Sequence, residues 1–141
     1  MKIEIWGILA VAGAFISNLF GGWNAALTTL AIFMAIDWIT GIIVAGVFKK
    51  SPKTETGALE SKAGLKGLFK KMAMLVAVLV AYRLDVLAGT TVLKDGAIIA
   101  FIANEAISII ENTGLMGVQW PPLITNAIDL LKKKHVGSDA K

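Results

Sequence analysis

Four long apolar segments, separated by short polar or basic segments, dominate the order of hydrophobic and polar positions along the chain. The run from Met72 to Tyr82 is apolar on every side of a helix, whereas a helix of a soluble bundle has one polar face. Roughly 20 apolar residues in a helix cross the ~30 Å hydrocarbon core of a bilayer. The pattern therefore predicts four membrane-spanning helices, at about 3–20, 25–48, 72–92 and 96–112.

Two shorter segments have the pattern of helices that lie in the lipid headgroup region. In the first, lysines recur every four residues after Ser61, and two glycines favour a bend before the third span. In the second, apolar residues recur at helical spacing after a pair of prolines. We expect interfacial helices at 61–71 and 122–134, and a disordered basic tail at 135–141. The basic residues expected at the membrane surface are Lys62, Lys66, Lys70, Lys71, Lys132, Lys133 and Lys134.

The expected fold class is an all-α integral membrane protein with a single domain over residues 1–134. Its architecture is a bundle of four transmembrane helices, with three as the alternative, that assembles into oligomers. With 141 residues, 56% of them hydrophobic, and a mean hydropathy of +0.72, the chain is too short to bury so many apolar helices in a soluble core. Cysteine is absent, which excludes disulfides and thiolate metal sites.

The placement of lysines predicts the orientation in the membrane, because loops rich in Lys and Arg stay in the cytoplasm. Lysines crowd the segment 49–71 and follow the last span, whereas the turn 18–24 has no charge and Lys94 is balanced by Asp95. Both termini are therefore expected in the cytoplasm. The basic segments adjoin membrane spans, so anionic lipid headgroups are the expected partner and nucleic acid is not. A signal peptide cleaved after Ala14 is the alternative for the first span, but its apolar region would be very short.

Charged residues lie inside three of the predicted spans. Each charge at mid-depth costs about 3 kcal/mol on insertion scales, so these side chains must face each other, another subunit or water. Arg83 and Asp85 are two residues apart and cannot pair within one helix, although Arg83 has the alternative of reaching outward to the interface. The residues expected to be buried charges are Asp37, Arg83 and Asp85, and Glu105 lies on the fourth span.

The fourth span carries a polar stripe on an otherwise apolar helix. At about 100° per residue, Glu105, Ser108 and Asn112 share one face. Two interpretations are compatible: hydrogen bonding between helices, and a surface that faces water or another subunit in a pore. The stripe consists of Asn104, Glu105, Ser108, Glu111 and Asn112. Small residues at close-packing spacing occur on the first two spans, at Gly13, Ser17, Gly21, Thr40 and Gly41.

Catalytic chemistry is not expected. The chain has one histidine and no cysteine, and it lacks a phosphate-binding loop, zinc-ligand spacing and a nucleophile triad. We therefore predict no enzyme activity, no cofactor and no metal ion.

Five short motifs occur in an order that resembles the toxin-secretion/phage-lysis holin family of Gram-positive bacteria and their phages. The resemblance covers about residues 30–132, and members are often drawn with three spans. The motifs are Asp37-Trp-Ile-Thr40-Gly41, Ser61-Lys-Ala-Gly64-Leu-Lys-Gly67-Leu-Phe-Lys70-Lys71, Asp85, Asn104-Glu105-Ala-Ile-Ser108-Ile-Ile-Glu111-Asn112 and Gly117-Val-Gln-Trp-Pro121.

The resemblance implies a holin, which accumulates in the bacterial cytoplasmic membrane late in phage infection and forms large homo-oligomeric lesions. Such lesions release a cell-wall-degrading endolysin, and relatives beside clostridial toxin genes are associated with toxin export. Two other classes of protein stay open, and buried acids alone suit the first of them equally well. One is a small ion or proton channel or a transporter subunit, and the other is a membrane adaptor or antiholin that opens nothing.

Overall fold

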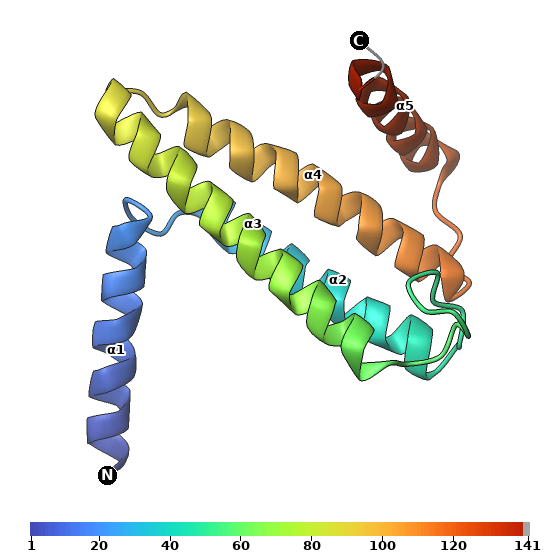
Figure 1. Ribbon diagram of the computed structural model, residues 1–141, viewed down its shortest axis with the longest axis horizontal. Helices are drawn as coiled ribbons and strands as arrows, with labels where there is room; N and C mark the ends of the chain where they lie inside the picture. Colours follow the sequence, from blue (N-terminus) through green and yellow to red (C-terminus); the bar gives the residue numbers. More distant parts are fainter. Residues whose placement is uncertain (140–141) are drawn as a thin grey trace.

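The computed structural model describes the backbone of residues 1–139 and the side chains of residues 1–130. Within that part every regular element is an α-helix, so the all-helical prediction is confirmed (Figure 1). Residues 140 and 141 of the expected disordered tail lie outside the described residues, as do the side chains of Lys132, Lys133 and Lys134. The helices are α1 (Lys2–Leu19), α2 (Ala25–Gly46), α3 (Ser61–Ala88), α4 (Val92–Leu115) and α5 (Pro122–Asp139).

The helix ends follow from local residue chemistry. Asn24 caps the N-terminus of α2, because its side-chain oxygen accepts a hydrogen bond from the backbone N–H of Leu27 at 2.9 Å. Gly89 ends α3 in the left-handed conformation (φ 71°), which a residue without a Cβ adopts at low cost. Proline fits the first position of α5, where the missing N–H would have no helical partner.

Helices α2, α3 and α4 form a three-helix unit. α2 packs mainly against α4, α4 also packs against α3, and the contact between α2 and α3 is smaller. The apolar core lies in one half of this unit, where the first half of α2 meets the second half of α3 and the start of α4. Its buried residues are Phe20, Leu27, Leu30, Met34, Met74, Val78 and Ile98.

The first helix stands apart from the three-helix unit. Figure 1 shows α1 pointing away from α2 after the turn that joins them, and α1 has no buried residue. Apolar side chains such as Ile3 and Trp6 are 87% and 70% exposed. A helix that is apolar all round and uncovered needs lipid or another protein around it.

Two helices of the described part, α1 and α2, are long and apolar enough to cross a membrane by length and composition. α3 and α4 have comparable or greater length but carry charged residues in their middle turns. α2 has a single charged residue, Asp37, whereas α3 and α4 each carry several, and the positions of these charges are described below.

Residues 61–71 do not form the separate surface helix that the lysine spacing predicted. They are the first turns of α3, which continues as one helix to Ala88 without a break at Gly64 or Gly67 (Figure 1). Trp38 on α2 explains this arrangement, because its indole N–H donates to the carbonyl of Gly64 at 3.0 Å and its ring lies beside Gly67. The segment is thus held against α2.

Near the other end of the chain, α5 extends to Asp139, beyond the expected end at 134.

The segment 47–60 folds back over the end of α2 before α3 begins. The backbone N–H of Ser51 donates to the carbonyl of Gly57 at 3.0 Å, and the N–H of Lys50 donates to Val44 in α2 at 3.1 Å. Gly57 has a φ of 77°, and a Cβ at this position would lie 2.4 Å from the Lys49 carbonyl oxygen. Only glycine fits there without a shift of the backbone. We call residues 47–60 the connecting loop.

Candidate functional site

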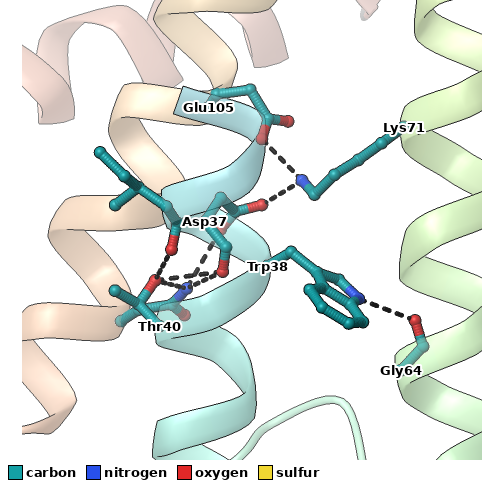
Figure 2. Close-up of polar contacts among 8 residues, drawn as sticks. Asp37, Trp38, Thr40, Gly64, Lys71 and Glu105 are labelled. Carbon is teal, nitrogen blue, oxygen red and sulfur yellow. Dashed lines mark hydrogen bonds and ion pairs between the residues drawn. The ribbon is translucent and has the colours of Figure 1, made fainter. Parts of the chain in front are cut away.

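The centre of the three-helix unit holds two buried ion pairs that share one lysine. Figure 2 shows the Lys71 side chain of α3 reaching between Asp37 of α2 and Glu105 of α4. Its ammonium nitrogen lies 2.5 Å from Asp37 Oδ2 and 2.6 Å from Glu105 Oε2. The three side chains are only 6%, 12% and 3% exposed for Asp37, Lys71 and Glu105 respectively. We call these three residues the charge triad.

The charge triad lies near mid-height of the helices that carry it. At a rise of about 1.5 Å per residue, Asp37 and Glu105 are each roughly 14–20 Å from both ends of their helices. Lys71 lies about 15 Å beyond the start of α3. Two carboxylates and one ammonium group give the triad a formal net charge of −1. Such a buried group is stable only with full hydrogen bonding or access to water.

Asn112 extends the network by joining α4 to α2. Its side-chain amide donates to Asp37 Oδ1 at 3.1 Å, to the Asp37 carbonyl at 3.2 Å and to Thr40 Oγ1 at 3.0 Å. The Thr40 hydroxyl in turn donates to the Ile36 carbonyl at 2.8 Å. Both Asp37 side-chain oxygens therefore have a partner on another helix, which fixes the relative position of all three helices.

A cavity of about 220 Å³ adjoins the charge triad, between the three helices and the connecting loop. Asp37, Lys71 and Glu105 form part of its wall, together with Ser108 and Trp38. The hydroxyl of Thr54, which also lines the cavity, is buried and has no hydrogen-bond partner within the described part of the chain. The cavity is thus polar on several sides, and it lies at the end of the unit opposite the apolar core.

The polar stripe of α4 consists of buried residues on one face of the helix and exposed residues that flank this face. Glu105 and Asn112 are buried at 2% and 6% exposure, and they contact Lys71 of α3 and Asp37 of α2 respectively, whereas Ser108 between them is half-buried. Asn104 and Glu111 flank this face, are exposed and line the cavity. The stripe therefore supplies hydrogen bonds between helices within the single chain. It also supplies polar groups to an open cavity.

Of the three charges expected to be buried, Asp37 and Asp85 are 4% and 2% exposed. The expectation for Arg83 is corrected, because its side chain is exposed on α3. The physical reason is the spacing of two residues from Asp85, which places Arg83 roughly 200° around the helix, on the side away from α4.

The expectation that Lys71 lies at the membrane surface is also corrected. Lys62, Lys66 and Lys70 are exposed, as expected of surface residues, but Lys71 belongs to the charge triad. The signal for this role is the register of Gly64, Gly67 and Lys71, which share the face of α3 that meets α2.

A second buried cluster lies where α3 turns into α4, and we call it the Asp85 corner. Asp85 Oδ1 accepts from the Thr90 hydroxyl at 2.6 Å and from the Leu93 N–H at 3.1 Å, and Oδ2 accepts from the Lys94 N–H at 2.7 Å. The carboxylate of one helix thus caps the first turn of the next, where the helix dipole favours an anion. Asp85 is therefore satisfied without a cationic side chain.

Lys94 connects the same corner to the turn that follows α1. Its ammonium group donates to the carbonyl of Phe20, at the end of α1, and lies 5.1 Å from the centre of the Tyr82 ring. Gly21 lies against that ring with a φ of 75°, and a Cβ here would be 2.3 Å from Tyr82 Cε2. The sequence did not reveal this role for Lys94, because the adjacent Asp95 balances its charge.

The predicted packing residues take different positions. Thr40 and Gly41 face Asn112 on α4, since Thr40 accepts its hydrogen bond and a Cβ at Gly41 would be 3.8 Å from Asn112 Nδ2. Gly21 belongs to the turn after α1, and Ser17 is half-buried near it. A Cβ added at Gly13 would meet nothing within 4 Å, so that part of α1 makes no contact within the described part of the chain.

Comparison with known proteins places these features in a family. The model of the bacteriophage holin family matches residues 14–133. An uncharacterized protein of Listeria innocua is 34% identical over all of this chain and 93% of its own length. A 14.9 kDa protein in the nagH 3' region of Clostridium perfringens is 37% identical over 92% of each chain.

A protein of Bacillus phage phi105, described as a probable holin, is 32% identical over 77% of this chain and 76% of its own length. No solved structure matches. The family match includes the charge triad, the polar stripe and the Asp85 corner. The chain belongs to the bacteriophage holin family.

Proposed function

We propose that this chain is a pore-forming holin that oligomerises in the bacterial cytoplasmic membrane and opens lesions through which an endolysin reaches the cell wall. Membership of the bacteriophage holin family, together with the apolar helices α1 and α2, supports the membrane location. The observation that carries the proposal is the charge triad at mid-height of three packed helices. Its polar groups are satisfied within one chain, and they can exchange those partners for water or for another subunit when the helices separate.

Four membrane spans are consistent with the lengths of the helices. α3 and α4, with 28 and 24 residues, are about 42 Å and 36 Å long, enough for a ~30 Å hydrocarbon core. Asp37, Asp85 and Glu105 turn inward and are each less than 5% exposed, so the outer surface of the unit need not carry these charges into lipid. With basic segments on the inner side, both chain termini lie in the cytoplasm.

Contact with anionic headgroups is the role we assign to the exposed lysines at the start of α3. Lys62, Lys66 and Lys70 are exposed on successive turns, next to the connecting loop, which carries three more lysines. Each lysine near an anionic surface contributes about 1 kcal/mol of attraction at moderate salt. These residues anchor one end of the bundle at the inner membrane surface.

The size of the cargo requires a large assembly. A folded enzyme of a few hundred residues is roughly 40 Å across. A bundle of helices that are each about 10 Å wide has no internal passage of that width. A ring of about ten or more copies is needed for such an opening, with the polar face of α4 as its lining. A toxin is the alternative cargo for the same lesion.

Expression in bacteria that also make an endolysin without an export signal tests this function. The expected result is an abrupt fall in culture turbidity, accompanied by endolysin activity in the medium. Leakage of potassium with the endolysin retained would instead support a small ion channel. Harmless accumulation in the membrane would support an adaptor or an antiholin.

A further inference from the structure

The cavity beside the charge triad lies at one end of the three-helix unit. Its walls come from the second half of α2, the start of α3, the second half of α4 and the connecting loop. Beyond the triad, in the opposite direction, the apolar core closes the unit. Leu30, Val78 and Ile98 have no exposed surface there, and Met34 and Met74 are 5% and 7% exposed.

Small side chains keep this cavity open on the side of α3. Ala63, Gly64 and Gly67 line it, and a Cβ at Gly64 would meet nothing within 4 Å. The remaining wall offers several groups that bind water: the Ser108 hydroxyl, the Thr54 hydroxyl and the side chain of Asn104. A cavity of this size holds water when several hydrogen-bonding partners line it, whereas a wholly apolar one stays dry.

The charges of the triad give a separate reason for water. The formal charge of −1 near the middle of a bilayer has an unfavourable solvation energy of several kcal/mol if only apolar groups surround it. Lys71 and Asn112 satisfy the Asp37 oxygens, whereas one oxygen of Glu105 is bonded to Lys71. Water in the adjoining cavity lowers the energy of the remaining charge.

We propose that the cavity is a water-filled vestibule, open on the side of the connecting loop and closed by the apolar core, which brings water and small ions to the charge triad in each subunit before assembly. This inference rests on the proposed insertion of the three helices in a membrane. It adds that the cytoplasm, and not the opposite compartment, has access to the triad while the membrane is still sealed. Each subunit then contains half of an aqueous path before any lesion forms.

Cysteine labelling tests the vestibule directly, because the natural chain has no cysteine. Ser108→Cys and Ala63→Cys place a thiol on two different walls of the cavity. Val78→Cys places one in the closed apolar core, and Ile99→Cys places one on the exposed apolar side of α4. Each variant is treated with a charged, membrane-impermeant thiosulfonate, in inverted vesicles that expose the cytoplasmic side and separately in intact cells.

The vestibule predicts that Ser108→Cys and Ala63→Cys react in inverted vesicles at least about tenfold faster than both controls, because only a hydrated thiolate reacts. Both variants should be protected in intact cells before lysis. Equal rates at Ser108→Cys and Val78→Cys, or fast labelling from the outside, would overturn the vestibule. Similar labelling rates for Ser108→Cys and Ala63→Cys would exclude a local structural defect in one variant as the cause of fast labelling.

Lysis is recorded for the same variants, so that failure of the vestibule and failure of the holin function are distinguished. Slow labelling in a variant that still lyses cells refutes the vestibule and leaves the function intact. Fast, one-sided labelling in a chain that never releases an endolysin supports the vestibule and refutes the function.

Discussion

The ammonium group of Lys71 lies 2.5 Å from a carboxylate oxygen of Asp37, a residue 34 positions earlier on the neighbouring helix. This pair joins α3 to α2, and the second contact of Lys71, with Glu105, joins α3 to α4. The packing between α2 and α3 is otherwise sparse, so this ion pair and the hydrogen bond from Trp38 to Gly64 are the polar links between the two helices within the described part of the chain. The first predictions therefore concern this side chain.

Replacing Lys71 with methionine is expected to destabilise the three-helix unit by about 3–5 kcal/mol, because it leaves two buried carboxylates without a cation. Thermal denaturation of the detergent-solubilised protein measures the loss. Lys70→Met is the matched control, since Lys70 is adjacent but exposed, and it should change stability by less than about 0.5 kcal/mol. Equal effects of the two variants would show that the triad does not hold the helices together.

Glu105→Gln is expected to delay lysis at equal expression. The substitution removes one negative charge and leaves Asp37 and Lys71 as a neutral pair, while the amide oxygen still accepts a hydrogen bond from Lys71. The closed three-helix unit becomes more favourable, and separation of its helices becomes slower. The time from induction to the fall in turbidity measures the effect. Earlier lysis would contradict the view that the net charge of the triad favours opening.

Asp85→Ala is expected to cost about 1–2 kcal/mol, because the first turn of α4 loses its cap. Asp85→Asn keeps an oxygen acceptor and should restore part of this loss. Arg83→Ala is the control on the same turn of α3, and its exposed side chain predicts a change below about 0.5 kcal/mol. A larger loss for Arg83→Ala than for Asp85→Ala would refute the assignment of the buried charge at this corner.

Gly21→Ala is expected to weaken the attachment of α1 to the three-helix unit. The left-handed conformation costs roughly 1–2 kcal/mol for an alanine, and the new Cβ must displace the Tyr82 ring. Gly13→Ala is the matched control, because it adds the same methyl group where nothing lies within 4 Å. Protease cleavage in the turn 20–24 of the solubilised protein is the measurement. Faster cleavage is expected for Gly21→Ala alone, and equal cleavage of both variants would contradict the contact with Tyr82.

The helices and the inward position of several polar residues could be predicted from the sequence. Glu105 and Asn112 recur on one face of an apolar helix, and Asp37 lies in the middle of another, so their burial follows from the cost of a charge in an apolar setting. Periodicity within a single helix is sufficient for this conclusion. It says which face is buried and nothing about the partner.

The partner of those acids could not be predicted in the same way. Lys71 lies at the end of a run of lysines that has the pattern of a surface helix, and only its contact with α2 and α4 distinguishes it from Lys70. The role of Asp85 as a cap also depends on two helices, because the N–H groups that donate hydrogen bonds to it belong to the first turn of α4. The helices could be predicted from the sequence, but the side-chain contacts between them could be identified only from the structure.

The central claim, that copies of this chain open a passage for folded protein, is tested most directly with purified protein in sealed lipid vesicles. The vesicles contain potassium and a folded enzyme with the size of an endolysin, and the release of both is measured as the protein-to-lipid ratio rises. We expect potassium and active enzyme to escape together above a threshold ratio, because assembly of many copies precedes opening. Complete loss of potassium with the enzyme fully retained at every ratio would contradict the claim.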